Sequence, residues 1–327
     1  MLIAALALTL TVGAQADGFV RHKHLVEHVT SQGCAYCPWG DHVLELLGEM
    51  RSDIARVTIH GNQGATDEFR TFKSEGLIGF LGASVMPSAT FDRTPYEGSF
   101  MQVVSAYPAD QQALAEFFND QLDQNITTPV LADVVIDAQY NDTTRQLQVN
   151  VNGDVTSDFD ATFGNEVTLT VYIIEDSLVA RQLYQTTWVD DFVHNNVFRD
   201  ALSNYRGDAL KWNDDRTRYA NDYTFTLKPA WKVENMSIVA FVSRNTSVYR
   251  NVINCQLLAL RDLLVQPAVA GDVTGDGQVD IADVNAIINI MLGKVTGDEQ
   301  QVTGDVTGDG AVDITDVNAI INILLGK

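Results

Sequence analysis

Basic residues are scarce in this chain. Its 327 residues include 21 Lys and Arg against 43 Asp and Glu, which gives a formal net charge of −22. A surface this acidic repels the phosphates of nucleic acids and the headgroups of anionic membranes. Nucleic-acid binding through a basic face is therefore excluded, and bound cations are the expected partners.

Cysteine is scarce as well, because the chain has only Cys34, Cys37 and Cys255. Three cysteines are too few for a disulfide scaffold and allow one local pair with one thiol left over. Long apolar runs are also lacking. The longest one, residues 2–12, is shorter than the ~20 residues that a transmembrane helix needs, so the sequence predicts no transmembrane span.

The run at residues 2–12 fits the apolar region of a secretory signal. Ala14-Gln15-Ala16 follows it with the small-x-small pattern of a cleavage site, although no basic residue precedes Arg21. The pattern predicts a signal peptide over residues 1–16, and the alternative is a buried N-terminal helix or strand. Export favours a secreted or cell-surface location, where a cysteine pair can form a disulfide.

The last part of the chain is duplicated. Residues 272–294 and 305–327 are 33 positions apart and are identical at 20 of 23 positions. Each copy begins with a twelve-residue acidic loop of EF-hand spacing, in which Gly277 or Gly310 stands at the sharp turn. Apolar residues then recur at helical spacing. The sequence predicts two loop–helix units that bury each other's apolar stripe.

Calcium is the ion that this loop spacing predicts. Oxygen atoms at positions 1, 3, 5, 7, 9 and 12 hold Ca²⁺ in EF-hand loops. In the first copy these residues are Asp272, Thr274, Asp276, Gln278 through its carbonyl, Asp280 and Asp283. In the second copy they are Asp305, Thr307, Asp309, Ala311 through its carbonyl, Asp313 and Asp316. Threonine at position 3 and aspartate at position 12 depart from the usual residues, but four carboxylates remain in each loop and predict two sites.

With these loops and helices, residues 271–327 closely resemble a type I dockerin. The resemblance implies a cohesin-type partner domain and attachment to a larger assembly, of which polysaccharide-degrading complexes are the best-known kind. It also places the partner contacts at loop positions 10 and 11, which are Ile281, Ala282, Ile314 and Thr315. The alternative is a calcium-stapled cap that binds no protein.

A C-x-x-C motif, Cys34-Ala35-Tyr36-Cys37, stands between a predicted strand at residues 24–29 and an amphipathic helix at 43–50. The start of a helix stabilises a thiolate, so Cys34 is the candidate nucleophile and Cys37 the resolving cysteine. A strand at 54–60, helices at 67–75 and 110–125, and a strand that Pro87 opens follow. This order resembles thioredoxin-like proteins, which implies that Pro87 is a cis-proline beside the cysteine pair.

Two alternatives to a redox site stay open. Zinc is one, because five histidines lie within the first 60 residues, and the spacing of Cys37 and His42 could give a Cys₂His set with a further histidine. They are His22, His24, His28, His42 and His60. The other is an inert structural disulfide, because the sequence identifies no buried acid or base for the thiols.

From residue 129 onward the pattern changes to strands. They are predicted at 131–140, 146–155, 166–174, 223–227, 236–242 and 252–260, and indicate a β-sandwich, whereas 177–221 is less regular. A C-x-x-C domain before such a sandwich, with His194-Asn195-Asn196-Val197-Phe198-Arg199, resembles a family of outer-membrane-associated bacterial proteins named for a twenty-eight-kilodalton member. We interpret His194 and Asp190 as a buried structural cluster rather than a ligand site, and Cys255 as an inert core thiol.

The sequence thus predicts a multi-domain protein of α/β, all-β and small all-α parts. These are a signal peptide at 1–16, a thioredoxin-like domain at 17–128, a β-sandwich at 129–265 and a dockerin-like calcium-binding tandem repeat at 271–327. The expected function is calcium-dependent docking of an exported body to a partner. The alternatives are a thiol–disulfide oxidoreductase of exported proteins, and a carbohydrate- or peptide-binding surface protein with a structural disulfide. No glycosidase site is identifiable, because carboxylate pairs are too common in this chain to be informative.

Overall fold

The structure is a computed structural model, and it describes residues 18–63, 67–105, 110–125, 130–264, 271–274, 278–294 and 304–326. The predicted signal peptide lies outside the described residues. Contacts divide the chain into two compact units, residues 1–261 and 262–327. Among the helices of the described residues, none has both the length and the apolar character that crossing a membrane requires.

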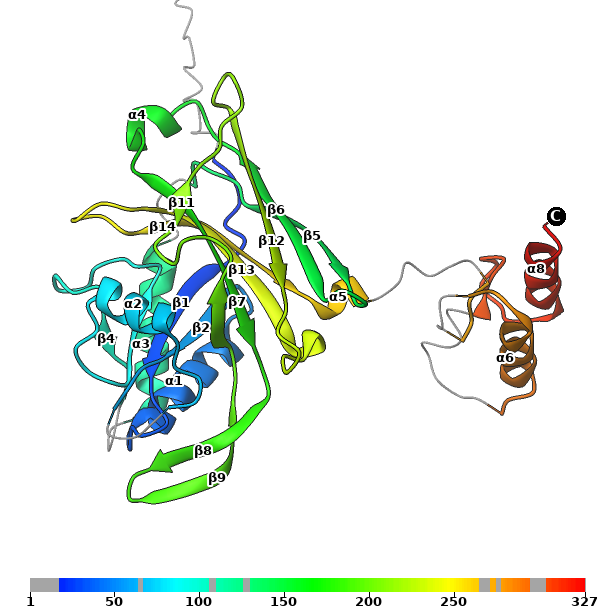
Figure 1. Ribbon diagram of the computed structural model, residues 1–327, viewed down its shortest axis with the longest axis horizontal. Helices are drawn as coiled ribbons and strands as arrows, with labels where there is room; N and C mark the ends of the chain where they lie inside the picture. Colours follow the sequence, from blue (N-terminus) through cyan, green and yellow to red (C-terminus); the bar gives the residue numbers. More distant parts are fainter. Residues whose placement is uncertain are drawn as a thin grey trace, which may run out of the picture. The chain divides into compact units, whose positions relative to one another are not determined.

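A nine-stranded sheet forms the centre of the first unit (Figure 1). Eight strands follow the order β14-β13-β7-β10-β2-β1-β3-β4, and β11 pairs with β7. The strands are β1 His24–Thr30, β2 Ile54–His60, β3 Ser88–Phe91, β4 Gln102–Val103, β7 Val167–Glu175, β10 Val197–Ala201, β11 Asp208–Ala209, β13 Met236–Arg244 and β14 Val252–Ala259. β1 and β2 are parallel, whereas β3 runs antiparallel to β1, and β4 antiparallel to β3.

Three helices pack on the part of this sheet that contains β1. They are α1 Cys37–Met50, α2 Phe72–Leu81 and α3 Gln111–Asn125. Side chains alternate along β1, so Val26 packs with α1 and α3, while Leu25 and Val29 pack with α2. The helix predicted at 67–75 begins later than expected, because the Thr71 side chain caps the backbone N–H of Ser74 and fixes the start of α2.

The sheet does not end at the boundary predicted between residues 128 and 129. β10 pairs with β2 in parallel through Val197 and Thr58, so strands from both predicted domains share one sheet. Val57, Phe198 and Phe241 lie in one buried cluster, and the core is therefore continuous across that boundary. The structure therefore has one mixed α/β body in place of the separate β-sandwich that we expected. Sequence periodicity identifies which residues form strands, but not which strands pair with each other.

The remaining strands of the body form two smaller sheets. β5 Val135–Asn141, β6 Gln146–Asp154 and β12 Arg218–Thr226 form one antiparallel sheet in the order β12-β6-β5. β8 Leu178–Tyr184 and β9 Thr187–His194 form a hairpin. The span that the sequence analysis found irregular thus contains β8 to β11. The short helices are α4 Phe159–Phe163, η1 Val233–Asn235 and α5 Arg261–Leu264.

The second unit contains α6 Ile281–Met291 and α8 Ile314–Leu324. Apolar residues of both copies share one small core, as predicted from the helical spacing. Its buried members are Val273, Val284, Ile287, Val317 and Ile320. The packing is reciprocal: a Cβ placed on Gly271 would lie 3.1 Å from Ile323 in the second copy, and a Cβ on Gly304 would lie 3.2 Å from Ile290 in the first.

Candidate functional site

Cys34 and Cys37 form a disulfide at the start of α1, directly after β1 and its short loop. Cys37 is the first residue of α1, and Pro38 follows it in the first turn, where a missing N–H costs no helical hydrogen bond. The unpaired N–H groups and dipole of this helix end favour a thiolate. Both cysteines are buried, with exposed fractions of 1% for Cys34 and 0% for Cys37.

Pro87 lies against the same helix turn. The peptide bond between Met86 and Pro87 is cis, as predicted. A Cβ placed on Gly40 would lie 2.7 Å from Cβ of Pro87 and 3.0 Å from Cγ2 of Val104, so only glycine permits this close approach. The structure therefore brings the predicted redox residues together around the first turn of α1.

The hairpin of β8 and β9 covers the C-x-x-C loop. Backbone N–H groups of Leu183 and Gln185 donate to the carbonyls of Gln32, at 2.8 Å, and Ala35, at 2.9 Å. The side-chain amide of Gln182 donates to the carbonyl of Cys34 at 3.1 Å. The sequence analysis missed this cover, because its residues come from a region without clear strand periodicity. A substrate cannot reach the disulfide while the hairpin holds this position.

A buried acid–base pair lies under α1. Nδ1 of His28 is 3.3 Å from Oδ1 of Asp41, and His28 is fully buried. Burial alone would raise the pKa of Asp41, but the neighbouring His28 and the charges of Arg56 and His60 outweigh it and hold this pKa below its usual value. Asp41 stands one turn after Cys37 on α1. The sequence analysis named His28 only as a possible zinc ligand and did not identify Asp41, although His28 shares the strand face of Val26, which α1 covers.

His194 lies in a second buried cluster. Its ring centroid is 5.3 Å from that of His60, whose Nδ1 is 2.8 Å from Asp67. Burial, reinforced by the neighbouring His60, lowers the pKa of His194 to about 4, so His194 is neutral near pH 7. Asp190 is exposed on β9 and does not join the cluster.

The structure does not assemble the zinc site that the sequence left open. The disulfide occupies both candidate cysteines, and all five histidines pair with separate carboxylates, His42 with Glu45 on the outer side of α1. The other four pairs are His22 with Asp133, His24 with Asp92, His28 with Asp41, and His60 with Asp67. Across the described ranges, no three His, Cys, Asp or Glu side chains have the spacing of a metal site. Cys255 is a buried thiol on β14, and burial raises its pKa well above the usual value.

The two acidic loops of the second unit are closed by aspartates at position 12. Asp283 accepts hydrogen bonds from the backbone of Val273, Thr274 and Asp280. Asp316 accepts in the same way from the backbone of Thr307 and Asp313. Both carboxylates are fully buried. Equivalent residues thus have equivalent roles in the two copies.

The carboxylate at position 1, Asp305, holds the second loop in a tight turn. Asp305 accepts hydrogen bonds from the backbone of Gly308, Asp309 and Gly310. Asp276 lies outside the described residues, so the first loop is described only in part. The predicted ligands provide carboxylate, hydroxyl and carbonyl oxygens, so the donor types fit calcium. Among the described residues of the second loop, the carboxylates are not gathered at the spacing of a metal site.

The predicted partner residues are exposed at the first turns of α6 and α8. Ile281 and Ile314 expose 67% and 57% of their surface, and Ala282 and Thr315 are exposed beside them. The aspartates that precede these residues cap the helices, since Asp280 accepts from the backbone of Ala282, and Asp313 from that of Thr315. Each copy thus presents one large apolar side chain at the same position.

Comparisons with known proteins identify both units. Residues 78–262 match the family of outer membrane protein Omp28, and residues 270–325 match the type I dockerin domain. HBP35 of Porphyromonas gingivalis has a similar structure, with a TM-score of 0.60 and 17% identity over 74% of this chain and 76% of that one. A domain of the outer membrane lipoprotein Omp28 from Porphyromonas gingivalis is 20% identical over 39% of this chain and 85% of that one, with a TM-score of 0.24.

No curated protein matches the chain. The family match spans more than half of it, from α2 to the end of the body, and the dockerin match covers both loop–helix copies. The chain therefore belongs to the Omp28 outer membrane protein family and carries a type I dockerin module in its second unit.

Proposed function

We propose that this protein attaches its body to a cohesin-type partner domain through a calcium-dependent tail. The observation that carries the proposal is the reciprocal packing of two nearly identical loop–helix copies around one core. This packing leaves Ile281 and Ile314 exposed in equivalent places. Exposed apolar side chains on so polar a surface are typical of protein contacts.

Calcium would be held by the oxygen sets of the two loops, one ion in each. The bound ion would neutralise the carboxylates that otherwise repel one another, and so stabilise the loops from which α6 and α8 begin. Asp283 and Asp316 support this assignment, because each is already fixed at position 12 by backbone N–H groups.

The family assignment confirms the predicted secreted or surface-associated location, because its named member is an outer membrane protein. A docking tail on such a protein would join the body to an assembly outside the cell. A cohesin-bearing scaffold of the kind found in polysaccharide-degrading complexes is the proposed partner.

Surface plasmon resonance tests the docking function. The full chain is passed over a panel of purified type I cohesin domains, once in millimolar Ca²⁺ and once in EGTA. We expect at least one cohesin to bind in Ca²⁺ only, and the variant with Ile281→Asp and Ile314→Asp to bind much more weakly. A matched control places aspartate at Val103, which is exposed on the body. A tail that is folded in Ca²⁺ but binds no cohesin of the panel contradicts the proposal.

Thiol–disulfide exchange is a second candidate function, which the geometry around Cys34 and Cys37 favours. We propose that β1–β4 with α1–α3 form a thioredoxin-like unit. Three observations support it: the strand order β2-β1-β3-β4, the disulfide at the start of α1, and Pro87 packed against Gly40. The buried His28–Asp41 pair adds the acid–base group that the sequence analysis did not find.

The exchange would take place in two steps. In the reduced protein, once the β8–β9 hairpin has opened, the Cys34 thiolate attacks a disulfide of an exported protein, forms a mixed disulfide and releases one substrate thiolate. Cys37 then gives up its proton to the His28–Asp41 pair and attacks the sulfur of Cys34. The second substrate thiolate leaves, the Cys34–Cys37 disulfide forms again, and two electrons have passed to the substrate.

Reduction of insulin in the presence of dithiothreitol tests this candidate. We expect the wild type to accelerate the reaction, Cys34→Ser to abolish the acceleration, and His28→Gln to slow it. His42→Gln is the matched control, because His42 is half exposed on the outer side of α1. Equal rates for the wild type and Cys34→Ser would leave a structural disulfide as the only role of the pair.

A further inference from the structure

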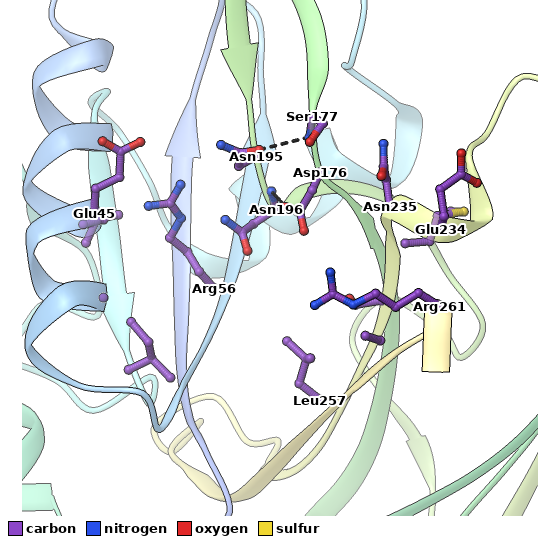
Figure 2. A pocket seen from close by; sticks show the side chains of 16 residues that line it. Glu45, Arg56, Asp176, Ser177, Asn195, Asn196, Glu234, Asn235, Leu257 and Arg261 are labelled. Carbon is purple, nitrogen blue, oxygen red and sulfur yellow. Dashed lines mark hydrogen bonds between the residues drawn. The ribbon is translucent and has the colours of Figure 1, made fainter. Parts of the chain in front are cut away.

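A polar pocket of about 530 Å³ opens in the body beside α1 and β2 (Figure 2). Further walls come from η1, β13 and β14, and from the two segments at which the β8–β9 hairpin leaves the main sheet. These two segments are tied together. Asp176 accepts a hydrogen bond from the backbone of Asn196 at 2.6 Å, and Asn195 accepts one from the backbone of Ser177 at 3.0 Å. This wall of the pocket is therefore preformed.

Two arginines extend toward the pocket from opposite sides, Arg56 from β2 and Arg261 from α5 (Figure 2). Among the arginines of the described residues, these are the two whose side chains make no hydrogen bond, ion pair or ring contact, although the charge of Arg56 acts on the nearby Asp41. Nε of Arg56 is also buried.

Carboxylates stand beside these arginines. Glu45, Asp176 and Glu234 line the same pocket, and Glu234 makes no hydrogen bond or ion pair with the described chain. Three carboxylates repel a phosphate or another multiply charged anion. The described lining residues include no aromatic ring on which a sugar could stack. A ligand that carries one negative and one positive group fits this mixture of charges.

We propose that this pocket binds an amino-acid zwitterion, either a free amino acid or a short peptide. The carboxylate of the ligand accepts hydrogen bonds from Arg56 and Arg261, and its ammonium group donates to Glu234. The amides of Asn196 and Asn235, which also line the pocket, contact the peptide groups. The volume is that of a small-ligand site and accommodates two or three residues.

Isothermal titration calorimetry on the full chain tests this site. The probes are trialanine, N-acetyl-trialanine and trialanine amide, so that each charged end is removed in turn. We expect saturable binding of one trialanine per chain, and an affinity that falls about tenfold or more when either end is blocked, because each block removes a charge-assisted hydrogen bond. Arg56→Gln and Arg261→Gln should have a similar effect, while Glu234→Gln should weaken trialanine but not the acetylated peptide.

Arg181→Gln is the matched control, because Arg181 lies over the ring of Trp188 on the hairpin and not in the pocket. Its affinity for trialanine should equal that of the wild type. Arg261 is exposed, so its loss tests the site without endangering the fold. No binding of trialanine overturns the proposal, as does unchanged binding in both pocket arginine variants. Equal affinity for the acetylated peptide would reveal a plain anion site instead.

Discussion

The side-chain amide of Gln182 donates a 3.1 Å hydrogen bond to the backbone carbonyl of Cys34, 148 residues earlier in the chain. The same amide donates to the carbonyl of Ser31 at 3.2 Å. This side chain thus acts together with the backbone hydrogen bonds of Leu183 and Gln185 to hold the β8–β9 hairpin over the disulfide. Because both cysteines are buried beneath it, chemistry at the disulfide depends on how often this hairpin opens.

Gln182→Ala should therefore expose the disulfide more often. Losing the two hydrogen bonds costs the closed state about 1–2 kcal/mol, which makes reduction about tenfold faster if opening limits the rate. Reduction by tris(2-carboxyethyl)phosphine is followed by alkylation and mass spectrometry. Gln139→Ala, at an exposed position of β5, serves as the control. An unchanged rate in Gln182→Ala would show that the side chain does not restrain the hairpin.

His194 should make the body less stable in mild acid. Its pKa is about 4 when folded and about 6.5 when unfolded, so the unfolded chain binds the extra proton first as the pH falls. Stability is therefore full above pH 6.5 and decreases between about pH 6.5 and 4, by on the order of 3 kcal/mol. The groups that act on His194 are His60, Asp41 and Asp67.

Urea unfolding at a series of pH values measures this dependence. In His194→Gln, the loss of stability between pH 6.5 and 4 should become smaller, because the glutamine does not titrate. His42→Gln is the control, since His42 is half exposed and its removal should leave the slope unchanged. A slope in His194→Gln that equals that of the wild type would assign the effect to other groups.

Gly40→Ala should destabilise the body. The new methyl group would meet Pro87 at 2.7 Å and Val104 at 3.0 Å, and such overpacking costs about 1–3 kcal/mol. Gly79→Ala is a matched control in α2, because its Cβ would meet nothing within 4 Å. Alanine has the higher helix propensity, so this control should be neutral or slightly stabilising. Thermal unfolding measures the melting temperatures of the two variants. Equal melting temperatures would contradict the close packing of α1 on Pro87.

Removing calcium should melt the second unit selectively. Calcium at 100 times its dissociation constant adds about 2.7 kcal/mol per site, and calorimetry of the full chain should show one transition that rises with Ca²⁺. Asp272→Ala with Asp305→Ala should abolish this rise, whereas Asp214→Ala, at an exposed turn of the body, should not. Identical scans in EGTA and in millimolar Ca²⁺ would refute metal binding by the loops.

Local patterns predicted much of the secondary structure. The strand expected at residues 54–60 coincides with β2, and the helix expected at 110–125 differs from α3 by one residue. Alternation along a strand and helical spacing are local signals, so one sequence suffices for them. Strand partners are not local. The pairing of β10 with β2 joins residues about 140 positions apart, and nothing in either segment identifies the other.

The candidate site residues follow the same division. The loop aspartates and the C-x-x-C pair were predictable because their chemistry requires fixed spacings in the sequence. The Gln182 contact and the His28–Asp41 pair were not, because each depends on elements that meet only in the folded chain. A partial signal existed for Asp41, which stands four residues after Cys37 and hence one helical turn away.

The strand pair β2–β10 also decides how this protein can be divided for experiment. An expressed fragment beginning near residue 130 would lack β2, one of the two neighbours of β10, and one stopping near residue 125 would lack β10, one of the two neighbours of β2. Each piece would present a bare edge with unpaired amides and carbonyls, which recruits other chains into aggregates. A shortened fragment of the body should therefore end only after β14, so that every strand keeps its hydrogen-bonded neighbours.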